Sequence, residues 1–483
     1  MASGRFRPTG ERIAALPSRL VLHLYDTATG QVRELALREP GTVAMYVCGP
    51  TVYGPPHVGH GRQTIVYDIL RRYLEWTGLR VRHVSNITDI DDNIINRAKR
   101  EQRPWDEITT KCEAIWWKAM DQMELARPTD IPHATEYVVE MVAMIGELVA
   151  SGSAYTTDDG VYLDVSTVPD YGLLAHQRLE DMLAGGGERE VFGAERKRNA
   201  ADFVLWKLSK PDEPSWPSPW GDGRPGWHSE CVVMSLDLLG EGFDLHCGGQ
   251  DLRFPHHENE RAQAVALGKR FANHWMHHAF VVDDGGEKLS KSKGNFTNLL
   301  DLLEQMDARS YRMLLLQSHY RSPVRVNADS VGAAERALEG LDTFVRRAAS
   351  ATATDAIGNA TATPDQALVA AFRARADDDL DTPGAMTIVF DAARQGNAAI
   401  DRGDKAVAAM MAATVRELCS AFGLVLKCEG EQVPADVAAR AAALDAARAA
   451  KDFTTADNVR AELHAAGWVV ETTASGTTVR RKT

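Results

Sequence analysis

Two histidines and a glycine within one tetrapeptide are the first residues of this chain with a clear chemical use. His57, Gly59 and His60 lie in His-Val-Gly-His, between an apolar run at 43–48 and a helical pattern from about residue 65. The N–H groups at the start of a helix bind anions, and a glycine lets a phosphate or flat base approach the backbone. The imidazoles can donate hydrogen bonds to phosphate oxygens as charge develops there. Taken alone, the tetrapeptide also fits two ordinary surface or core histidines.

A second phosphate-binding candidate is Lys-Leu-Ser-Lys-Ser-Lys-Gly-Asn at residues 288–295, which follows a strand-like run and the turn sequence Asp-Asp-Gly-Gly. Lys288 and Lys291, set among small hydroxyl residues, would form a mobile cationic loop that clamps a polyphosphate. A solvated charged loop is the alternative interpretation. Earlier in the chain, Asp251 ends Gly-Gly-Gln-Asp at 248–251, a sequence that also fits an ordinary turn.

Four residues from three distant segments form a candidate metal site. Cys48 ends a predicted strand, Cys231 closes Gly-Trp-His-Ser-Glu-Cys at 226–231, and His256 and Glu260 lie four apart in a predicted helix. Residues four apart share one helix face, and two thiolates, an imidazole and a carboxylate suit tetrahedral zinc. No compact Cys-x-x-Cys spacing is present, so spacing alone leaves buried cysteines and a surface His/Glu pair as the simpler interpretation.

The elements that must position these residues alternate between strands and helices. Short apolar runs at 20–25, 43–48 and 81–87 predict strands, and apolar residues at helical spacing predict a helix over 65–74. Strand, helix, strand indicates a βαβ unit, and so an α/β fold with a Rossmann-like parallel sheet. Sheet-like patterning resumes at 243–247 and 279–282 after a largely helical stretch. We therefore expect one catalytic domain, split by an insertion.

Five segments follow from these patterns. The first half of the catalytic domain spans 20–150, an insertion with strands at 160–165 and 203–208 spans 151–222, and the second half, with the lysine segment, spans 223–306. Residues 307–430 are expected to be a helical bundle with an Ala/Thr/Gly-rich linker at 348–363. A C-terminal module at 431–483 should contain one helix over 436–466 and a hairpin over 468–479.

Bulk composition narrows the class of protein. Of the 483 residues, 44% are hydrophobic and 25% are charged, as in soluble globular proteins, and no apolar run is long enough to cross a membrane. The basic residues 1–19 lack an apolar signal region, so we expect a cytoplasmic protein. Six widely spaced cysteines favour metal binding or burial over disulfides. The net charge of -13 excludes a uniformly basic surface but leaves room for a local basic groove.

The histidine tetrapeptide and the lysine segment together resemble the two signature motifs of class I aminoacyl-tRNA synthetases, His-Ile-Gly-His and Lys-Met-Ser-Lys-Ser. This chain differs in Val58 and Leu289, which are apolar residues of similar volume. The resemblance implies that His57, His60, Lys288 and Lys291 stabilise the transition state of adenylate formation. It also implies that Gly59 and Asp251 help to bind ATP, which carries Mg²⁺ on its phosphates.

Segments 48–53, 86–92, 226–231 and 254–260 resemble cysteinyl-tRNA synthetases, and the resemblance covers nearly the whole chain. It implies one zinc ion per chain, with Cys48, Cys231, His256 and Glu260 as ligands, and His257 and Glu258 as supporting residues. Thr88, Trp227 and His246 would line the pocket for the amino acid. A substrate thiol binds zinc as a soft thiolate and a serine hydroxyl does so poorly, so no editing domain is expected.

The implied reaction is the ligation of L-cysteine to tRNA(Cys) at the expense of ATP, by a monomer with no membrane contact. Residues 307–430 would include a segment that contacts the tRNA stem, and the C-terminal module would read the anticodon. Its candidates for stacking on bases and for hydrogen bonds are Arg448, Lys451, Arg460, Trp468, Arg480, Arg481 and Lys482. A solvated helix face with a basic tail is the alternative. The alternative function is that of a related ligase of mycothiol synthesis, which joins cysteine to an amino sugar. Such an enzyme has no use for an anticodon-binding module, so the module favours the tRNA ligase.

Overall fold

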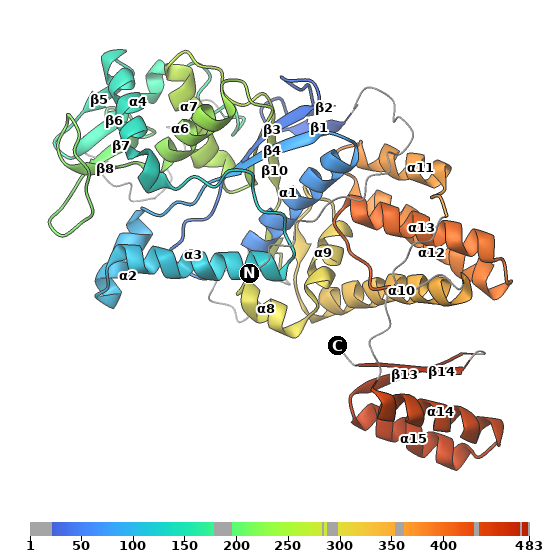
Figure 1. Ribbon diagram of the computed structural model, residues 1–483. Helices are drawn as coiled ribbons and strands as arrows, with labels where there is room; N and C mark the ends of the chain where they lie inside the picture. The colour runs from blue at the N-terminus through green and yellow to red at the C-terminus, as the bar shows by residue number, and fades with distance from the viewer. Residues whose placement is uncertain are drawn as a thin grey trace.

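The computed structural model describes residues 22–177, 196–282, 285–286, 298–352, 362–428, 434–473 and 476–481. Lys288, Lys291 and Lys482 lie outside these residues, as do the glycine-rich stretch at 184–187 and most of the expected linker at 348–363. Figure 1 shows an α/β region, a helical bundle beside it and a C-terminal module below the bundle. None of the described helices has the length and apolar character needed to cross a membrane.

A four-stranded parallel sheet lies at the centre of the α/β region, with strand order β10-β9-β3-β4. The strands are β3 (Thr42–Val47), β4 (Arg80–Ser85), β9 (Leu245–Gly249) and β10 (Trp275–His278). The three strands β3, β9 and β10 are buried along almost their whole length, which is typical of a parallel sheet covered on both faces. The sheet confirms the α/β fold predicted from the strand, helix, strand pattern.

Helix α1 (Val58–Trp76) connects β3 to β4 and packs against the sheet through Ile65, Ile69 and Leu70. Its apolar pattern predicts only the central part of the helix, over 65–74. The helix begins seven residues earlier because the histidine tetrapeptide forms a polar first turn with its own cap. The residues with chemical potential therefore lie at the helix N-terminus, at the carboxyl end of β3.

The chain between β4 and β9 carries helices and a second sheet. Its main helices are α2 (Asp92–Glu101), α3 (Trp105–Gln122) and α4 (Val138–Ala150). The second sheet is antiparallel, in the order β5 (Ala154–Thr156), β6 (Gly160–Leu163), β7 (Phe203–Leu208) and β8 (Gly223–Pro225). Helices α6 (Trp227–Leu239) and α7 (Glu258–Ala266) flank β9 along the chain. Trp206 is fully buried in the core that the second sheet shares with α4 and α6.

Short elements join the sheet to the bundle. Strand β11 (Val281–Val282) pairs in parallel with β12 (Val324–Arg325), and β1 (His23–Asp26) pairs with β2 (Gln31–Glu34). Helices α8 (Leu299–Gln305) and α9 (Ala308–Leu316) lie between β11 and β12 in the chain. The bundle consists of α10 (Ala328–Thr352), α11 (Gln366–Ala376), α12 (Thr382–Asp401) and α13 (Lys405–Ala421). One apolar core runs from α1 into this bundle.

The C-terminal module differs from its prediction in two ways. The single helix expected over 436–466 is two helices, α14 (Ala435–Ala449) and α15 (Phe453–Ala465), because Lys451 adopts a left-handed conformation (φ 58°) and Asp452 caps α15. The hairpin, β13 (Trp468–Thr473) with β14 (Gly476–Arg481), is as predicted. Trp468, expected to be exposed, is only 5% exposed and packs against Val437 and Leu463.

Candidate active site and metal centre

The N-terminus of α1 holds the two histidines in one arrangement. His57 is the N-cap: its Nδ1 accepts from His60 N at 3.2 Å, and His60 Nδ1 accepts from His57 N at 3.2 Å. The two rings stack with their centroids 3.6 Å apart. Because both Nδ1 atoms act as acceptors, the neutral imidazoles carry their protons on Nε2. Both residues are therefore N–H donors at a helix terminus that already favours anions.

Gly59 permits this arrangement. A Cβ atom on residue 59 would lie 2.9 Å from two atoms of the His57 ring. The start of α8 reaches the same place, since Asn298 forms a β-bridge with His57 and Leu299 N donates to Pro56 O at 3.0 Å. Lys288 and Lys291 precede Asn298 in the undescribed segment 287–297, so their position relative to the histidines stays a prediction.

Cys48, Cys231, His256 and Glu260 converge at the carboxyl edge of the parallel sheet, although 212 residues separate Cys48 from Glu260. Cys48 follows β3, Cys231 lies in α6, and a kinked turn at Arg253–His257, with extended backbone at Phe254, leads into α7 and brings His256 next to Glu260. All four side chains are buried, and their ligand atoms lie within 4.8 Å of one another. Cysteines, an imidazole and a carboxylate in one buried cluster are a donor set for a metal ion.

The separations within this cluster suit ligands of one ion. The two Sγ atoms are 3.7 Å apart without a disulfide, Cys48 Sγ is 3.5 Å from Glu260 Oε1, and Cys231 Sγ is 3.8 Å from His256 Nε2. Tetrahedral zinc with bonds of about 2.3 Å to sulfur has an S···S edge of about 3.8 Å. His256 Nε2 and Glu260 Oε1 lie closer, at a hydrogen-bond distance of 2.8 Å. The residues present thus fit a metal ion in chemistry, and the distance between the two sulfurs matches zinc.

A second donor set, formed by Cys48, His246, His257 and Glu260, shares two residues with the first. Glu260 turns Oε1 toward Cys48 and His256, while its Oε2 accepts a hydrogen bond from His246 Nε2. His246 therefore orients the carboxylate from outside the first set, as residues around metal sites commonly do. The first set contains both thiols, the softer ligands that zinc takes well, and so forms the better metal site.

Because the side chains of the cluster lie so close together, they shift one another's pKa values in different directions. Burial and the neighbouring Cys231 raise the pKa of Cys48. Burial also raises the pKa of Cys231, but the hydrogen bond from Cys48 and the nearby His256 outweigh it and bring that pKa to about 6. His246 and His256 likewise overcome burial and hold the pKa of Glu260 well below its usual range. A thiolate and a carboxylate at neutral pH are the forms that a metal ion needs.

Thr88 and Trp227 border the cluster. Thr88 Oγ1 donates to Glu230 Oε2 at 2.7 Å and accepts from Asn86 Nδ2 at 3.1 Å. The Trp227 ring stacks on His256 with centroids 4.0 Å apart, and 37% of this tryptophan is exposed. Asp251 is exposed two residues beyond the end of β9, at the same edge of the sheet. An exposed aromatic beside a buried metal cluster is suited to cover a small substrate.

Two residues of this region have supporting contacts that spacing did not predict. Asn86 Oδ1 accepts from Gly49 N at 2.8 Å, which holds the backbone next to Cys48. His257 Nε2 lies 3.3 Å from Cys48 Sγ, while its Nδ1 is 2.8 Å from His277 Nε2. For Asn86 the signal in the sequence is weak, a polar residue just after the end of β4. His257 was already expected as a supporting residue from the family resemblance.

Comparisons with known proteins assign this chain to a class of enzyme. Residues 34–336 match the family described as tRNA synthetases class I (C) catalytic domain, and residues 371–427 match the DALR domain. The structure of Mycobacterium tuberculosis methionyl-tRNA synthetase in complex with methionyl-adenylate shares this fold. Its TM-score is 0.57 at 14% identity, over 79% of this chain and 89% of that chain. Fold and matched domains together define a class I aminoacyl-tRNA synthetase, which is a ligase.

Curated relatives narrow the class further. The cysteine–tRNA ligase of Halorhodospira halophila is 42% identical over 477 residues, which cover 95% of this chain and all of the relative. That of Edwardsiella ictaluri is 41% identical over 96% of this chain and its own full length. The chain belongs to the cysteine–tRNA ligase family.

Proposed function

We propose that this chain activates L-cysteine with ATP and transfers it to the terminal ribose of tRNA(Cys), with one bound zinc ion selecting the thiol. The convergence of the four donor residues beside the histidine-bearing end of α1 carries this proposal. Gln63, on the first turns of α1, donates from Nε2 to Cys48 O at 2.7 Å and so joins the two sites. In open parallel sheets, ligands bind at the carboxyl ends of the strands. Here that place is beside β3, which has β4, the next strand in the chain, on one side and β9 on the other.

In the first step, the cysteine carboxylate attacks the α-phosphorus of ATP and pyrophosphate leaves. His57 and His60 would donate from Nε2 to the oxygens on which charge develops, and Gly59 would let the nucleotide approach. Lys288 and Lys291, with the Mg²⁺ that accompanies ATP, would neutralise the triphosphate. Asp251 would accept a ribose hydroxyl. The protein positions these groups and stabilises charge, and no protein nucleophile is needed.

Selection of cysteine would depend on the buried cluster. Cys48, Cys231, His256 and Glu260 would hold the zinc, and His246 would keep Glu260 oriented. When bound, the ion takes a thiolate readily and a serine hydroxyl poorly. An apolar pocket alone separates such similar substrates by only ~1–3 kcal/mol. Thr88 and Trp227 would close the pocket around the substrate.

Recognition of tRNA is assigned to the C-terminal part of the chain. Phe453, at the start of α15, is 65% exposed, and Arg448 and Lys451 precede it closely in the chain. An exposed ring beside cations suits unpaired anticodon bases. Since Trp468 is buried, Phe453 takes the stacking role, and Arg460, Arg480, Arg481 and Lys482 remain candidates for contacts with the anticodon bases. We place the enzyme in the cytoplasm as a monomer, with the five segments described above as its domains.

Cys231→Ser tests the proposed function. Removing one thiolate should weaken zinc retention and raise KM for cysteine in ATP–pyrophosphate exchange, each by about tenfold or more, while KM for ATP is unchanged. Cys419→Ser is the matched control, because Cys419 is equally buried but lies in α13. Elemental analysis and exchange assays with cysteine and serine provide the measurements. Unchanged affinity for cysteine in Cys231→Ser, or exchange with serine as fast as with cysteine, would contradict the proposal.

A further inference from the structure

Arg62 is a buried cation two residues beyond the histidine tetrapeptide, only 1% exposed. Its Nη1 donates to Phe280 O at 2.6 Å, and its Nη2 donates to Tyr320 O at 2.9 Å and Ser322 O at 2.6 Å. Burial lowers the pKa of Arg62 to about 10, so the side chain is still charged at neutral pH. Within the described residues, this guanidinium has backbone carbonyls as partners and no carboxylate.

The three carbonyls belong to the segments that carry β11 and β12. Val324 N donates to Phe280 O at 3.1 Å and Ala279 N donates to Tyr320 O at 2.9 Å, so these segments already pair with each other. Arg62 binds both of them to α1 at once. Strand β11 ends at Val282, directly before the segment that contains Lys288 and Lys291.

The chain that follows the lysine segment is fixed to the same turn of α1. Tyr311 Oη donates to Val58 O at 2.7 Å, and Leu299 N donates to Pro56 O. A Cβ on Gly61 would lie 2.8 Å from Leu299 and 2.9 Å from Tyr311, so a glycine is needed for this close packing. The first turns of α1 therefore contact both flanks of the lysine segment.

The acceptors of Arg62 are themselves held in place. Tyr320 Oη donates to Asp379 Oδ1 at 2.5 Å, and the Arg321 side chain forms an ion pair with the same carboxylate. Asp379 lies in the loop between α11 and α12, with a left-handed backbone (φ 55°). The planar fork of Arg62 thus joins the histidine-bearing helix to a segment fixed by the bundle.

A buried charge without an acid partner costs stability compared with an apolar residue of similar volume. The guanidinium instead contributes orientation, because its planar fork directs several N–H donors at carbonyls in fixed positions. We propose that Arg62 is a positioning residue for adenylate formation, which sets His57 and His60 relative to β11 and β12. Because this role presupposes that the histidines act on ATP, it rests on the proposed function.

Arg62→Lys in the full-length, zinc-loaded enzyme tests this role, because a single Nζ cannot occupy both positions from which Nη1 and Nη2 reach the carbonyls. We expect kcat for ATP–pyrophosphate exchange to fall roughly ten- to a hundredfold, with KM for cysteine and zinc content unchanged. Arg312→Lys is the matched control. Arg312 is 3% exposed, pairs with Asp68 and donates to Phe422 O, away from the histidines. It should lower Tm and leave kcat as in the parent.

A double-mutant cycle with His60→Ala separates positioning from a general loss of stability. If Arg62 acts through the histidines, Arg62→Lys should lower kcat far less in the His60→Ala background than in the parent. Parental kcat in Arg62→Lys, or an undiminished effect in the double variant, overturns the inference. Should Arg62→Lys lose zinc or its folded spectrum, Arg62→Gln, which keeps two N–H donors, is measured in the same cycle. The proposed function is tested separately, by cysteine-dependent ATP–pyrophosphate exchange in the parent and by the loss of this exchange in His60→Ala alone.

Discussion

Gly59 is the residue on which the geometry of the two histidines depends most directly. Gly59→Ala would place a Cβ 2.9 Å from the His57 ring, so the ring must move and the reciprocal cap with His60 is lost. We expect kcat for pyrophosphate exchange to fall about tenfold or more, as when a donor to a developing oxyanion is displaced. KM for cysteine and zinc content should stay as in the parent.

Gly146→Ala is the control for that substitution. Gly146 lies within α4, and a Cβ there would meet nothing within 4 Å. Alanine should stabilise this helix by up to ~1 kcal/mol without changing exchange kinetics. An exchange rate for Gly59→Ala equal to that of Gly146→Ala would show that the placement of the His57 ring has no bearing on catalysis.

The sequence names the site residues that belong to a local motif or match a family, whatever their distance apart in the chain. The tetrapeptide predicted donors at a helix start, and the four metal-ligand candidates do lie together. Arg62 had no such signal, because its three acceptors are backbone carbonyls 218, 258 and 260 residues away and no side-chain pattern encodes them. Trp468 was predicted to be exposed because alternation identifies a strand and leaves open which of its faces is covered.

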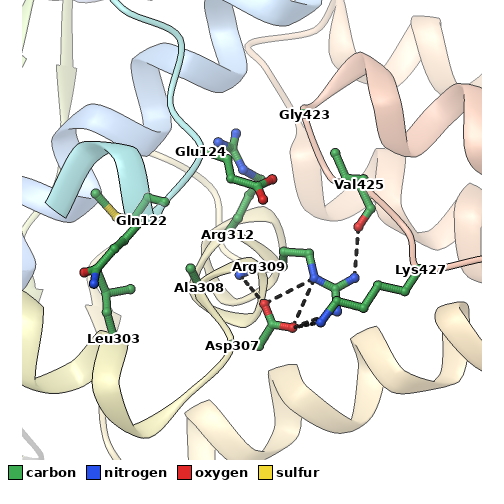
Figure 2. Close-up of a pocket in the computed structure, with 11 residues that line it drawn as sticks. Gln122, Glu124, Leu303, Asp307, Ala308, Arg309, Arg312, Gly423, Val425 and Lys427 are labelled. Atoms are coloured by element: carbon green, nitrogen blue, oxygen red, sulfur yellow. Dashed lines mark hydrogen bonds and ion pairs between the residues drawn. The ribbon is translucent and has the colours of Figure 1, made fainter. Parts of the chain in front are cut away.

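At the scale of elements, the segment after α13 is fastened by an ion network. Asp307 accepts from Arg309 Nη2 at 2.7 Å and from Lys427 Nζ at 3.0 Å, and Arg309 Nη1 donates to Val425 O at 2.9 Å (Figure 2). These residues line a cavity of about 340 Å³ between α3, α9 and the chain that leaves α13. The network thus fixes the last described residues before the C-terminal module to the start of α9.

Asp307→Asn should weaken this fastening while keeping the cap of α9, since asparagine caps helices well. Burial raises the pKa of Asp307, but hydrogen bonds from Arg309 and Lys427 lower it to about 2. A depressed pKa stabilises the fold at neutral pH, and this contribution is lost as the pH falls from about 4 to about 2. With allowance for solvent screening, the variant should lose roughly 1–2 kcal/mol at pH 7 and less at pH 3.

Urea unfolding at both pH values measures this difference. Asp365→Asn is the control, since Asp365 caps α11 through two backbone N–H groups and has no cation partner among the described residues. An equal loss of stability for the two variants, or a loss for Asp307→Asn that does not shrink at pH 3, would show that the ion network is not the cause.

The helices and strands of this protein differ in how well the apolar pattern of the sequence predicts them. Strands β3, β4 and β9 of the parallel sheet were predicted from short apolar runs, and helix α1 from apolar residues at helical spacing. The break between α14 and α15 was missed because it depends on one left-handed residue, Lys451, and on an aspartate cap within an otherwise uniform helical pattern. Strand β10 was missed because Trp-Met-His-His contains no β-branched residue.

At the scale of the whole molecule, the C-terminal module has a core of its own. Val437, Leu463 and Trp468 pack together, and Leu444 packs with Ala447 and Ala456 in a second cluster of the same module. Removing residues 434–483 should therefore expose none of the core that α1 shares with the bundle. The truncated enzyme should fold, hold its metal and retain cysteine-dependent pyrophosphate exchange.

Charging of tRNA(Cys) by this truncated enzyme should fall by at least about a hundredfold, because an anticodon-binding unit supplies several stacking and edge contacts of ~1–3 kcal/mol each. Phe453→Ala in the full-length chain should reproduce part of the loss, through KM for tRNA and with exchange unchanged. Full charging without residues 434–483 would contradict the role of the module. Such a result would instead favour the related ligase that joins cysteine to an amino sugar, because that enzyme has no use for an anticodon-binding module.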